Sequence, residues 1–495
     1  MLLNDLLKSI TVLNMEGDGS TDIRGICYDS RKVRPGSLFV AVEGFKNDGH
    51  NYVGRAVEAG ASAVLAQRMV EVPPGVPLVI TRDTRKGLAM VSAAFYGNPS
   101  RELLLVGVTG TNGKTTTTSL IASIYRAAGK KVGLIGTIAN YIGDRKLEAG
   151  HTTPESADLQ EILRDMVSEG VSVAVMEVSS HALSLERVAG CEFDVAVFTN
   201  LTQDHLDFHR DMEEYLEAKA HLFRSIGDGK RRFPSYAVVN ADDPHMARIA
   251  EASGAPVVTY GLSEKADMRA VDIKVTGRGC SFTAVSGKYG STHLSLRLTG
   301  LFNVYNALAA YTMAVEGGFS PDLVKEALEG VPGVPGRFET VDCGQDFTVV
   351  VDYAHTPDGL ENILKAAGTV ATGRVIAVFG CGGDRDRTKR PIMGEIAGRY
   401  SQVPIITSDN PRTEAPDVII RDIEEGIKRV APNGYRVIPD RREAIRLAVS
   451  VARSGDMVVI AGKGHEDYQI IGTQKLPFDD REEVKKVLEA LVKKK

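Results

Sequence analysis

Cysteine is scarce in this chain, and its spacing does not suggest pairing. The 495 residues include five widely scattered cysteines, with no C-x-x-C spacing among them: Cys27, Cys191, Cys280, Cys343 and Cys381. An odd, dispersed set argues against a zinc site or a dithiol redox centre. We therefore expect a protein of a reducing compartment, the cytoplasm.

Long apolar runs and a strong net charge are also missing. No segment approaches the roughly 18 consecutive apolar residues of a membrane span, and Asp5 interrupts the apolar core that a signal peptide would need in the first ten residues. We expect neither membrane insertion nor export. The net charge of −5 gives no general attraction for nucleic acid or an anionic membrane. Basic residues must therefore act locally, and we expect small-molecule partners and a monomer.

What the chain does have is length, glycine and alternating strand and helix patterns. With 495 residues and 50 glycines, it exceeds what one hydrophobic core serves. We predict three domains, 1–100, 101–335 and 336–495, with boundaries near Asn98-Pro99-Ser100 and Pro332-Gly-Val-Pro-Gly336. Apolar strands alternating with helical segments predict an α/β fold with mostly parallel sheets.

A glycine-rich loop follows the first apolar strand of the central region. Residues 103–118 read LLLVGVTGTNGKTTTT, the order of strand, loop and helix that a phosphate-binding loop requires. In such a loop Lys114 supplies a charge and the Thr115 hydroxyl reaches Mg²⁺. Val108 stands where the strict pattern has glycine, so a tight turn that contains lysine is the alternative. The predicted nucleotide-binding residues are consecutive: Gly110, Thr111, Asn112, Gly113, Lys114, Thr115 and Thr116.

Polar clusters follow two further apolar strands of the central region. The strand over 171–178 ends at Glu177, and the strand over 193–199 leads to His205. Ligands bind at such strand ends in parallel sheets. Glu177 is a plausible Mg²⁺ ligand and His205 a less usual one. For each of these residues, a role in capping a helix or in a hydrogen bond within its loop is an equal alternative.

Two other residues indicate little by themselves. Ser30 precedes a Pro35-Gly36 turn, where a loop could hold a polar ligand, but a serine satisfied within its own turn explains it equally well. Lys219 falls in a helix predicted over 211–223 and, taken alone, is a solvated surface lysine.

The region after Arg337 repeats the pattern of apolar strands followed by polar loops. The strands are predicted over 347–351, 375–380, 403–407 and 457–461. Their loops contain Asp352, Arg385, Asp409-Asn-Pro-Arg412 and Gly462-Lys-Gly-His-Glu466. This pattern favours a second open parallel sheet with a ligand crevice at its carboxyl edge, the alternative being a purely structural sheet. An amphipathic helix over 481–495 ends the chain.

Six ordered motifs make the chain resemble the Mur ligase family of bacterial cell-wall synthesis. They are Gly110-Thr-Asn-Gly-Lys-Thr115, Glu177-Val-Ser-Ser-His181, Asn200-Leu-Thr-Gln-Asp-His205, Asn303-Val-Tyr-Asn306, Gly336-Arg-Phe-Glu339 and Asp352-Tyr-Ala-His-Thr-Pro357. The resemblance covers essentially the whole chain. It implies an N-terminal domain for the UDP end of the substrate, a central P-loop ATPase and a C-terminal Rossmann-like domain that brings the amino acid. Val108 fits this family, whose loop resembles G-T-N-G-K-[TS].

The resemblance also implies a reaction and the residues that perform it. Asp29-Ser-Arg31 and Asp409-Asn-Pro-Arg412 look like those of members that add meso-diaminopimelate to UDP-N-acetylmuramoyl-L-alanyl-D-glutamate, using ATP, Mg²⁺ and an acyl phosphate. The implied catalytic residues are Lys114, His205 and Lys219. The implied Mg²⁺ ligands are Thr115, Glu177, His205 and a carbamylated Lys219. The implied ATP contacts outside the loop are Asn303, Arg337 and Asp352. The implied contacts to the UDP-muramoyl dipeptide are Ser30, Thr152, Thr153, Ser179 and Arg187.

Carboxylate chemistry narrows the choice of amino acid. Diaminopimelate differs from lysine by a second carboxylate, and a guanidinium fork binds a carboxylate bidentately. Arg412 is therefore the expected reader, because a lysine-adding enzyme would gain nothing from burying it. The other residues expected around the amino acid are Arg385, Asp409, Asn410, Pro411, Gly462 and Glu466. The same reaction with L-lysine is the alternative, a solvated turn is the alternative for Arg412, and a nucleotide-dependent switch protein is a remote alternative for the whole chain.

Overall fold

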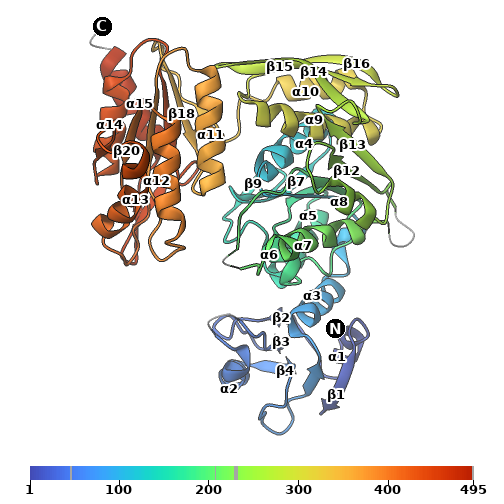
Figure 1. Ribbon diagram of the computed structural model, residues 1–495. Coiled ribbons are helices and arrows are strands. Elements are labelled where there is room, and N and C mark those ends of the chain that lie inside the picture. Colours follow the sequence, from blue (N-terminus) through green and yellow to red (C-terminus); the bar gives the residue numbers. More distant parts are fainter. Residues whose placement is uncertain (45–46, 207, 228–231, 493–495) are drawn as a thin grey trace. The chain divides into compact units, whose positions relative to one another are not determined.

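The computed structural model describes residues 1–44, 47–206, 208–227 and 232–492 (Figure 1). Contacts divide the chain into two compact units. The first contains Met1–Gly110, Tyr125–Thr199 and Glu213–Thr259, and the second contains Thr111–Ile124, Asn200–Met212 and Tyr260–Lys495. The three predicted domains and their two boundaries stay predictions.

The first unit begins with a sheet of strand order β1-β5-β4-β3-β2. Its neighbours are parallel except for β1 and β5. Leu38 and Val40 face one apolar cluster and Phe39 and Ala41 the other, as expected of a strand buried on both faces. The strands are β1 (Val12–Glu16), β2 (Gly25–Cys27), β3 (Ser37–Val40), β4 (Ala61–Ala66) and β5 (Leu78–Thr81), and the helices are α1 (Leu3–Leu7), η1 (Gly49–Tyr52), α2 (Val53–Glu58) and α3 (Thr84–Phe95).

A second set of neighbouring strands in the first unit has the order β12-β11-β6-β10-β7-β8-β9. It is parallel from β12 to β7 and antiparallel at β8 and β9. Its strands are β6 (Leu104–Thr109), β7 (Val132–Ile135), β8 (Asn140–Ile142), β9 (Arg145–Leu147), β10 (Val173–Glu177), β11 (Val195–Phe198) and β12 (Tyr236–Asn240). The helices between them include η2 (Pro99–Arg101), α5 (Ser156–Ser168), α6 (Ser180–Ser184), α7 (Met212–Arg224) and α8 (Met246–Ala252).

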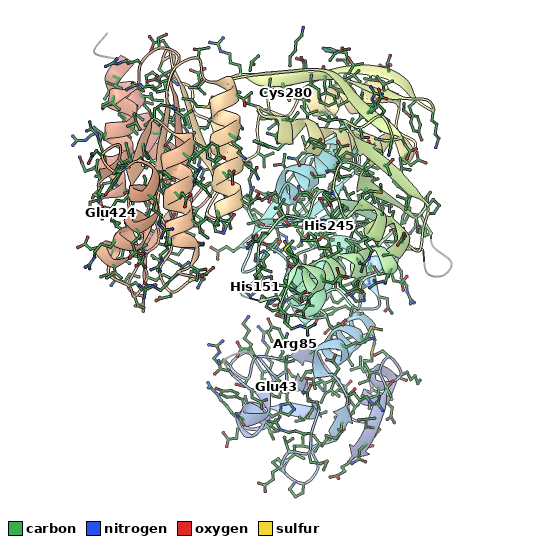
Figure 2. The ribbon with its side chains drawn as sticks, viewed as in Figure 1. Glu43, Arg85, His151, His245, Cys280 and Glu424 are labelled. Carbon is green, nitrogen blue, oxygen red and sulfur yellow. The ribbon has the colours of Figure 1, made fainter. Side chains whose placement is uncertain are left out.

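The second unit contains an antiparallel set of strands, β14 (Met268–Thr276), β15 (Gly279–Ser286) and β16 (Gly290–Leu296). The end of β13 (Val257–Gly261) pairs with β14. Helices α4 (Lys114–Ala127), α9 (Leu301–Glu316) and α10 (Pro321–Glu329) belong wholly or mainly to this unit. Cys280 lies in β15 (Figure 2), and all five cysteines are free thiols.

The last sheet of the second unit has the strand order β17-β18-β22-β19-β20-β21 and is parallel except at β17. Its strands are β17 (Glu339–Thr340), β18 (Thr348–Asp352), β19 (Val375–Phe379), β20 (Val403–Ile406), β21 (Arg436–Val437) and β22 (Met457–Ala461), with a separate hairpin of β23 (Tyr468–Ile471) and β24 (Gln474–Pro477). Its helices are α11 (Pro357–Val370), α12 (Lys389–Tyr400), α13 (Pro416–Val430), α14 (Arg441–Val451) and α15 (Asp480–Val492).

Helices cover both faces of this last sheet. Apolar residues of α11, α12 and α13 pack on one face, and those of α14 and α15 pack on the other (Figure 1). The sheet is therefore doubly wound, and the loops after β18, β19, β20 and β22 share its carboxyl edge. The predicted α/β class with mostly parallel sheets is confirmed. The predicted terminal helix is present up to Val492, and residues 493–495 lie outside the described part.

Among the described residues, no helix is both long enough and apolar enough to cross a membrane.

Candidate active site

The glycine-rich loop has the predicted form of strand, loop and helix. Strand β6 ends at Thr109, and α4 begins at Lys114. Gly113 has a φ of +87°, and a Cβ on it would lie 2.3 Å from Asn306 Oδ1. Both the backbone angle and the available space therefore require glycine. Lys114 Nζ donates to the Thr111 carbonyl oxygen at 2.8 Å.

Asparagine side chains hold this loop in shape. Asn112 N donates to Asn200 Oδ1 at 2.9 Å, and Asn200 Nδ2 donates to the Asn112 carbonyl at 3.2 Å. Asn306, which packs against Gly113, donates to Asn303 Oδ1 at 3.0 Å. Sequence reasoning assigned no role to Asn200 or Asn306, although both stand inside the quoted motifs.

Arg337 and Asp352, two predicted nucleotide contacts, lie in the same unit as the start of α4. Arg337 Nη2 donates to Thr115 Oγ1 at 2.9 Å, and its guanidinium lies 4.9 Å from the Tyr353 ring centroid. The Asp352 carboxylate accepts from Phe338 N at 2.6 Å and Ala354 N at 2.8 Å. Burial raises the pKa of the Asp352 carboxyl, and the Arg337 charge opposes that rise.

Glu177, at the end of β10, is buried in a cluster of hydroxyl groups within the first unit. It is 1% exposed. Its carboxylate accepts from Thr137 N at 2.8 Å and from Thr137 Oγ1 at 3.0 Å. Thr153 Oγ1 donates to the Glu177 carbonyl at 2.8 Å, and the Thr152 hydroxyl lies 3.1 Å from that of Thr137. The structure thus brings together Glu177, Thr152 and Thr153.

Two more predicted substrate contacts join this cluster. Ser179 N donates to Thr153 Oγ1 at 3.1 Å, and the Ser179 side chain caps α6. Arg187 Nη1 donates to the Thr153 carbonyl at 3.1 Å, and Arg187 pairs with Glu155 at 2.7 Å. The Arg187 side chain is only 12% exposed, and the residue lies after the end of α6. Ser30 is buried and lies in a turn after β2.

The interpretation of Lys219 as a solvated surface lysine is wrong. The residue lies on α7 and is 1% exposed, with Nζ 4.1 Å from the Tyr215 ring centroid. The charge of a lysine is rarely buried without a functional or structural reason. The sequence of one helix does not show which of its faces packs against other elements. The burial of Lys219 could therefore be seen only in the folded structure.

The predicted metal ligands are divided between the two units. Glu177 and Lys219 belong to the first unit, and Thr115 and His205 to the second. His205 has a φ of +56°, and its Nε2 lies 3.4 Å from Asp204 Oδ2. Within the described ranges, no group of three or more His, Cys, Asp or Glu side chains is arranged to hold a metal ion. The available donors are one buried carboxylate, hydroxyls and an imidazole, which suit a hard cation only in part.

The carboxyl edge of the last sheet gathers buried charged and amide side chains. Asp409 and Asn410 are 7% and 5% exposed. Asn410 Nδ2 donates to Glu466 Oε2 at 3.0 Å. Lys463 Nζ, with a fully buried side chain, donates to the same Glu466 oxygen at 3.0 Å and to Asn410 Oδ1 at 3.2 Å. Lys463 lies inside a predicted motif, but no role was assigned to it.

Gly462 leaves room for Asp409. Gly462 has a φ of +122°, and a Cβ on it would lie 2.4 Å from Asp409 Oδ2. Within the part of the chain that the structure describes, this buried oxygen has no hydrogen-bond partner. A buried acceptor of this kind suits a ligand that brings its own donor.

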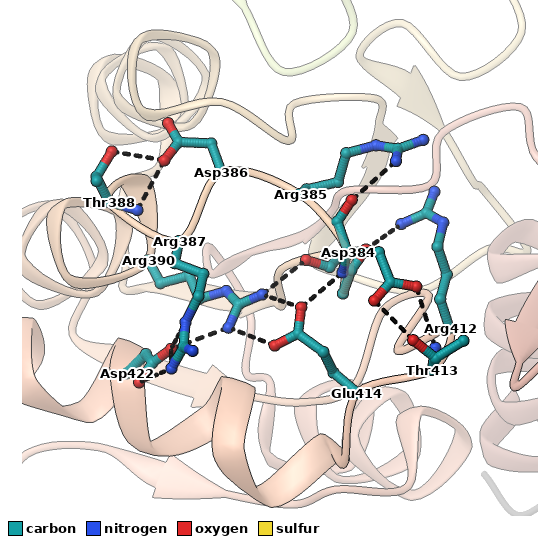
Figure 3. Close-up of polar contacts among 12 residues, drawn as sticks. Asp384, Arg385, Asp386, Arg387, Thr388, Arg390, Arg412, Thr413, Glu414 and Asp422 are labelled. Carbon is teal, nitrogen blue, oxygen red and sulfur yellow. Dashed lines mark hydrogen bonds and ion pairs between the residues drawn. The ribbon is translucent and has the colours of Figure 1, made fainter. Parts of the chain in front are cut away.

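Two arginines of this edge donate hydrogen bonds to consecutive backbone carbonyl groups. Arg412 Nη1 donates to the Gly383 carbonyl at 2.8 Å, and Arg385 Nη1 donates to the Asp384 carbonyl at 2.9 Å (Figure 3). Arg385 is exposed and Arg412 half-buried. Pro411 lies between Asn410 and Arg412 and is buried. The predicted amino-acid contacts therefore share one sheet edge.

Family comparisons agree with this fold and these motifs. Three family descriptions match: "Mur ligase family, catalytic domain" at residues 22–96, "Mur ligase middle domain" at 108–314, and "Mur ligase, glutamate ligase domain" at 336–464. The chain belongs to the Mur ligase family. The prediction that it is an ATP-dependent ligase is confirmed.

Individual relatives carry a more specific name. The chain is 50% identical over 493 residues to the UDP-N-acetylmuramoyl-L-alanyl-D-glutamate–2,6-diaminopimelate ligase of Syntrophomonas wolfei, covering 100% of both chains. It is 52% identical to the ligase of that name from Geobacillus thermodenitrificans, covering 97% of this chain and 98% of the other. A solved structure of a ligase with that name has a TM-score of 0.70 at 34% identity, covering 99% of both chains.

Proposed function

We propose that this chain adds meso-diaminopimelate to the D-glutamate γ-carboxylate of UDP-N-acetylmuramoyl-L-alanyl-D-glutamate, using ATP, as a monomeric cytoplasmic enzyme of peptidoglycan synthesis. Full-length relatives at about half identity carry the name of this reaction. The observation that carries the proposal lies at the carboxyl edge of the last sheet.

That edge offers charges of both signs to one ligand. Arg385 and Arg412 donate hydrogen bonds to adjacent carbonyl groups. Glu466 accepts a hydrogen bond from Asn410, and Asp409 is the residue before Asn410. Meso-diaminopimelate has two carboxylates and two amino groups, so it can engage both kinds of side chain. A guanidinium fork binds a carboxylate bidentately, and L-lysine lacks the second carboxylate. Arg412 is therefore the proposed reader of the distal carboxylate.

The glycine-rich loop is the proposed site of ATP. Its backbone N–H groups and the start of α4 favour phosphate oxygens. Lys114 would stabilise the charge on the transferring phosphoryl group, as in other phosphoryl-transfer sites. Arg337, which lies just before β17, donates a hydrogen bond to Thr115. Asn303 accepts a hydrogen bond from Asn306, which packs against Gly113. Asp352 fixes the backbone around Arg337, since its carboxylate accepts from Phe338 N.

Candidate Mg²⁺ ligands lie in both units. In the first unit these are the Glu177 carboxylate and Lys219, whose carbamylation would convert a cation into an oxygen-donor anion. In the second unit they are the Thr115 hydroxyl and, less usually, His205. When bound, Mg²⁺ neutralises the charge on phosphate oxygens. Thr152, Thr153, Ser179 and Arg187 would bind the UDP-muramoyl dipeptide, as would Ser30.

The chemistry explains why the reaction needs both the glycine-rich loop and the carboxyl edge of the last sheet. A carboxylate oxygen is a poor leaving group, so the D-glutamyl γ-carboxylate first attacks the γ-phosphoryl group of ATP and ADP leaves. The amino group of diaminopimelate then attacks the acyl phosphate, and inorganic phosphate leaves as the amide forms. The contributions of the protein are positioning and electrostatic stabilisation.

A panel of amino acids tests the proposal. The full-length enzyme is incubated with ATP, Mg²⁺, the UDP-muramoyl dipeptide and one of meso-diaminopimelate, L-lysine or L-ornithine. Phosphate release and the mass of the amide product are measured, with the dipeptide omitted in a matched control. We expect both signals with meso-diaminopimelate and neither without the dipeptide.

Other outcomes point to other functions. Amide formation with L-lysine but not with diaminopimelate would identify a lysine-adding ligase. Slow phosphate release that depends on neither the dipeptide nor an amine would indicate a nucleotide-dependent switch and would contradict the proposal.

A further inference from the structure

A buried arginine without an assigned role lies behind the two loops that contain Arg385 and Arg412. Arg390, in the first turn of α12, has a fully buried side chain. Its Nη2 donates to Glu414 Oε1 at 2.8 Å, and its Nη1 donates to Glu414 Oε2 at 3.0 Å and to Asp422 Oδ2 at 2.9 Å. These three side chains, Arg390, Glu414 and Asp422, are called the buried ion cluster (Figure 3).

The buried ion cluster contains one cation and two carboxylates. Arg387 adds a second cation, since its Nη2 lies 3.0 Å from Asp422 Oδ2, but its side chain is 61% exposed. Hydrogen bonding to Arg390 lowers the pKa of Glu414 to about 2, so this carboxyl is ionised at neutral pH. A buried guanidinium is tolerated when its forked donors meet carboxylates in this way. Removal of one partner leaves the other charge uncompensated.

The cluster connects two loops at the carboxyl edge of the sheet. The first loop, 380–388, follows β19, and the second, 407–415, follows β20. Glu414, in the second loop, accepts a hydrogen bond from Asp384 N of the first at 2.6 Å. Asp384 Oδ1 in turn accepts from Thr413 Oγ1 at 2.8 Å. Arg390 therefore fixes a carboxylate that itself fixes the backbone at Asp384.

The backbone at these points adopts an unfavourable conformation. Asp384 and Arg412 have φ values of +54° and +50°, in the left-handed region that side chains other than glycine seldom adopt. Such residues persist only where the surroundings hold them. The Gly383 and Asp384 carbonyls, which accept from Arg412 and Arg385, lie in this held segment. The position of both guanidinium groups thus depends on the loop connection.

We propose that Arg390, through Glu414 and Asp422, is a positioning residue that sets the relative placement of the Arg385 and Arg412 guanidinium groups and so determines selection of an amino acid with two carboxylates. The inference rests on the proposed function. Arg390 touches no substrate in this role. Its effect is confined to the amino-acid site, since the cluster contacts the loops at 380–388 and 407–415.

Steady-state kinetics of Arg390→Met in the full-length enzyme test the inference. We expect the KM for meso-diaminopimelate to rise about tenfold or more, because small misplacements of binding groups are costly. The KM values for ATP and the UDP-muramoyl dipeptide should stay within about twofold of wild type, and kcat within about threefold. Arg387→Met, which removes the exposed cation on the same Asp422, is the matched control and should leave all three KM values within about twofold.

The separation of KM from kcat distinguishes positioning from stability. A merely structural role would lower the folded fraction and hence the apparent kcat, with every KM unchanged, and that result would overturn the inference. An equal rise in the KM values of ATP and diaminopimelate would also overturn it. Glu414→Gln provides a milder variant in case Arg390→Met does not fold, with an expected rise of about threefold to fivefold in the KM for diaminopimelate alone. No rise in that variant would count against the inference.

The wild-type enzyme in the same experiment separates this inference from the proposed function. If wild type uses diaminopimelate and the variants have unchanged KM values, the positioning role alone is wrong. If wild type uses an amino acid with one carboxylate, the proposed function is wrong; a selective rise in the KM of that amino acid would then support the positioning role of Arg390 and contradict its role in selecting two carboxylates. If no amino acid is joined, both are wrong.

Discussion

The glycine-rich loop and the carboxyl edge of the last sheet are the two regions proposed to bind ATP and the amino acid, and they are built from different groups. Neutral amides shape the loop: Asn200 bonds both ways with Asn112, and Asn306 packs against Gly113. At the sheet edge, buried ions do the equivalent task, as in the contacts of Arg390 and Lys463 with carboxylates.

The difference fits what each region is proposed to recognise. Phosphate oxygens are alike, and a run of backbone N–H groups with a helix N-terminus binds them with few side-chain charges, here that of Lys114. An amino acid with two carboxylates and two amino groups must be matched by charges at set positions. Those charges hold their positions only when they are paired and partly dehydrated, which requires further charged residues behind them.

Lys114→Ala should have the largest effect and shows how far the loop depends on a side-chain charge. We expect kcat for phosphate release to fall about a thousandfold, because transferring phosphoryl oxygens lose a charge partner. Lys130→Ala, an exposed lysine just after α4, is the control and should retain full activity. A loss of less than tenfold would mean that backbone donors suffice, and the contrast with the sheet edge would become sharper.

Lys219→Ala tests whether catalysis also requires a charged side chain of the first unit. We expect a loss of about a hundredfold or more in kcat, with partial rescue by a short carboxylic acid that occupies the vacated space. Lys219→Arg keeps the positive charge but cannot be carbamylated, and it should be inactive without rescue. Full activity in either variant would remove the proposed role of Lys219.

Arg412→Ala tests the fixed charges of the sheet edge directly. The KM for meso-diaminopimelate should rise about a hundredfold, since a charge-assisted bidentate contact is lost, while the KM for ATP stays unchanged. Arg421→Ala, an exposed arginine on α13, is the matched control. Unchanged use of diaminopimelate by Arg412→Ala would show that this edge does not read the second carboxylate.

The smallest effect is a pH dependence of stability at the buried ion cluster. The pKa of Glu414 is lowered from 4.5 to about 2, first by its hydrogen bond with Arg390. Its stabilising contribution is therefore complete above pH 4.5 and is lost as the pH falls towards 2. Chemical denaturation should find Glu414→Gln less stable than wild type by about 1–2 kcal/mol at pH 7. The difference should shrink below pH 4.5, and a constant difference would contradict the ion-pair account.

The sequence predicted the parts of this structure that are local. The strand, loop and helix around Gly113 and Lys114 and the parallel strands leading to Asp352 and Arg412 follow from short patterns of apolar and turn residues. Burial of Lys219 was not predictable in this way, because a helix pattern does not identify its neighbours. Arg390 was missed for the same reason: its partners Glu414 and Asp422 are 24 and 32 residues away.

The contact between Gly383 and Pro411 limits how amino-acid choice can be changed. A Cβ on Gly383 would lie 1.9 Å from the Pro411 carbonyl oxygen, so Gly383 can carry no side chain while Pro411 keeps its position. Single substitutions at Gly383 would meet this steric barrier. Grafting residues 380–388 and 407–415 together, as one cassette taken from a donor enzyme, is the route by which a new amino-acid preference could be transferred.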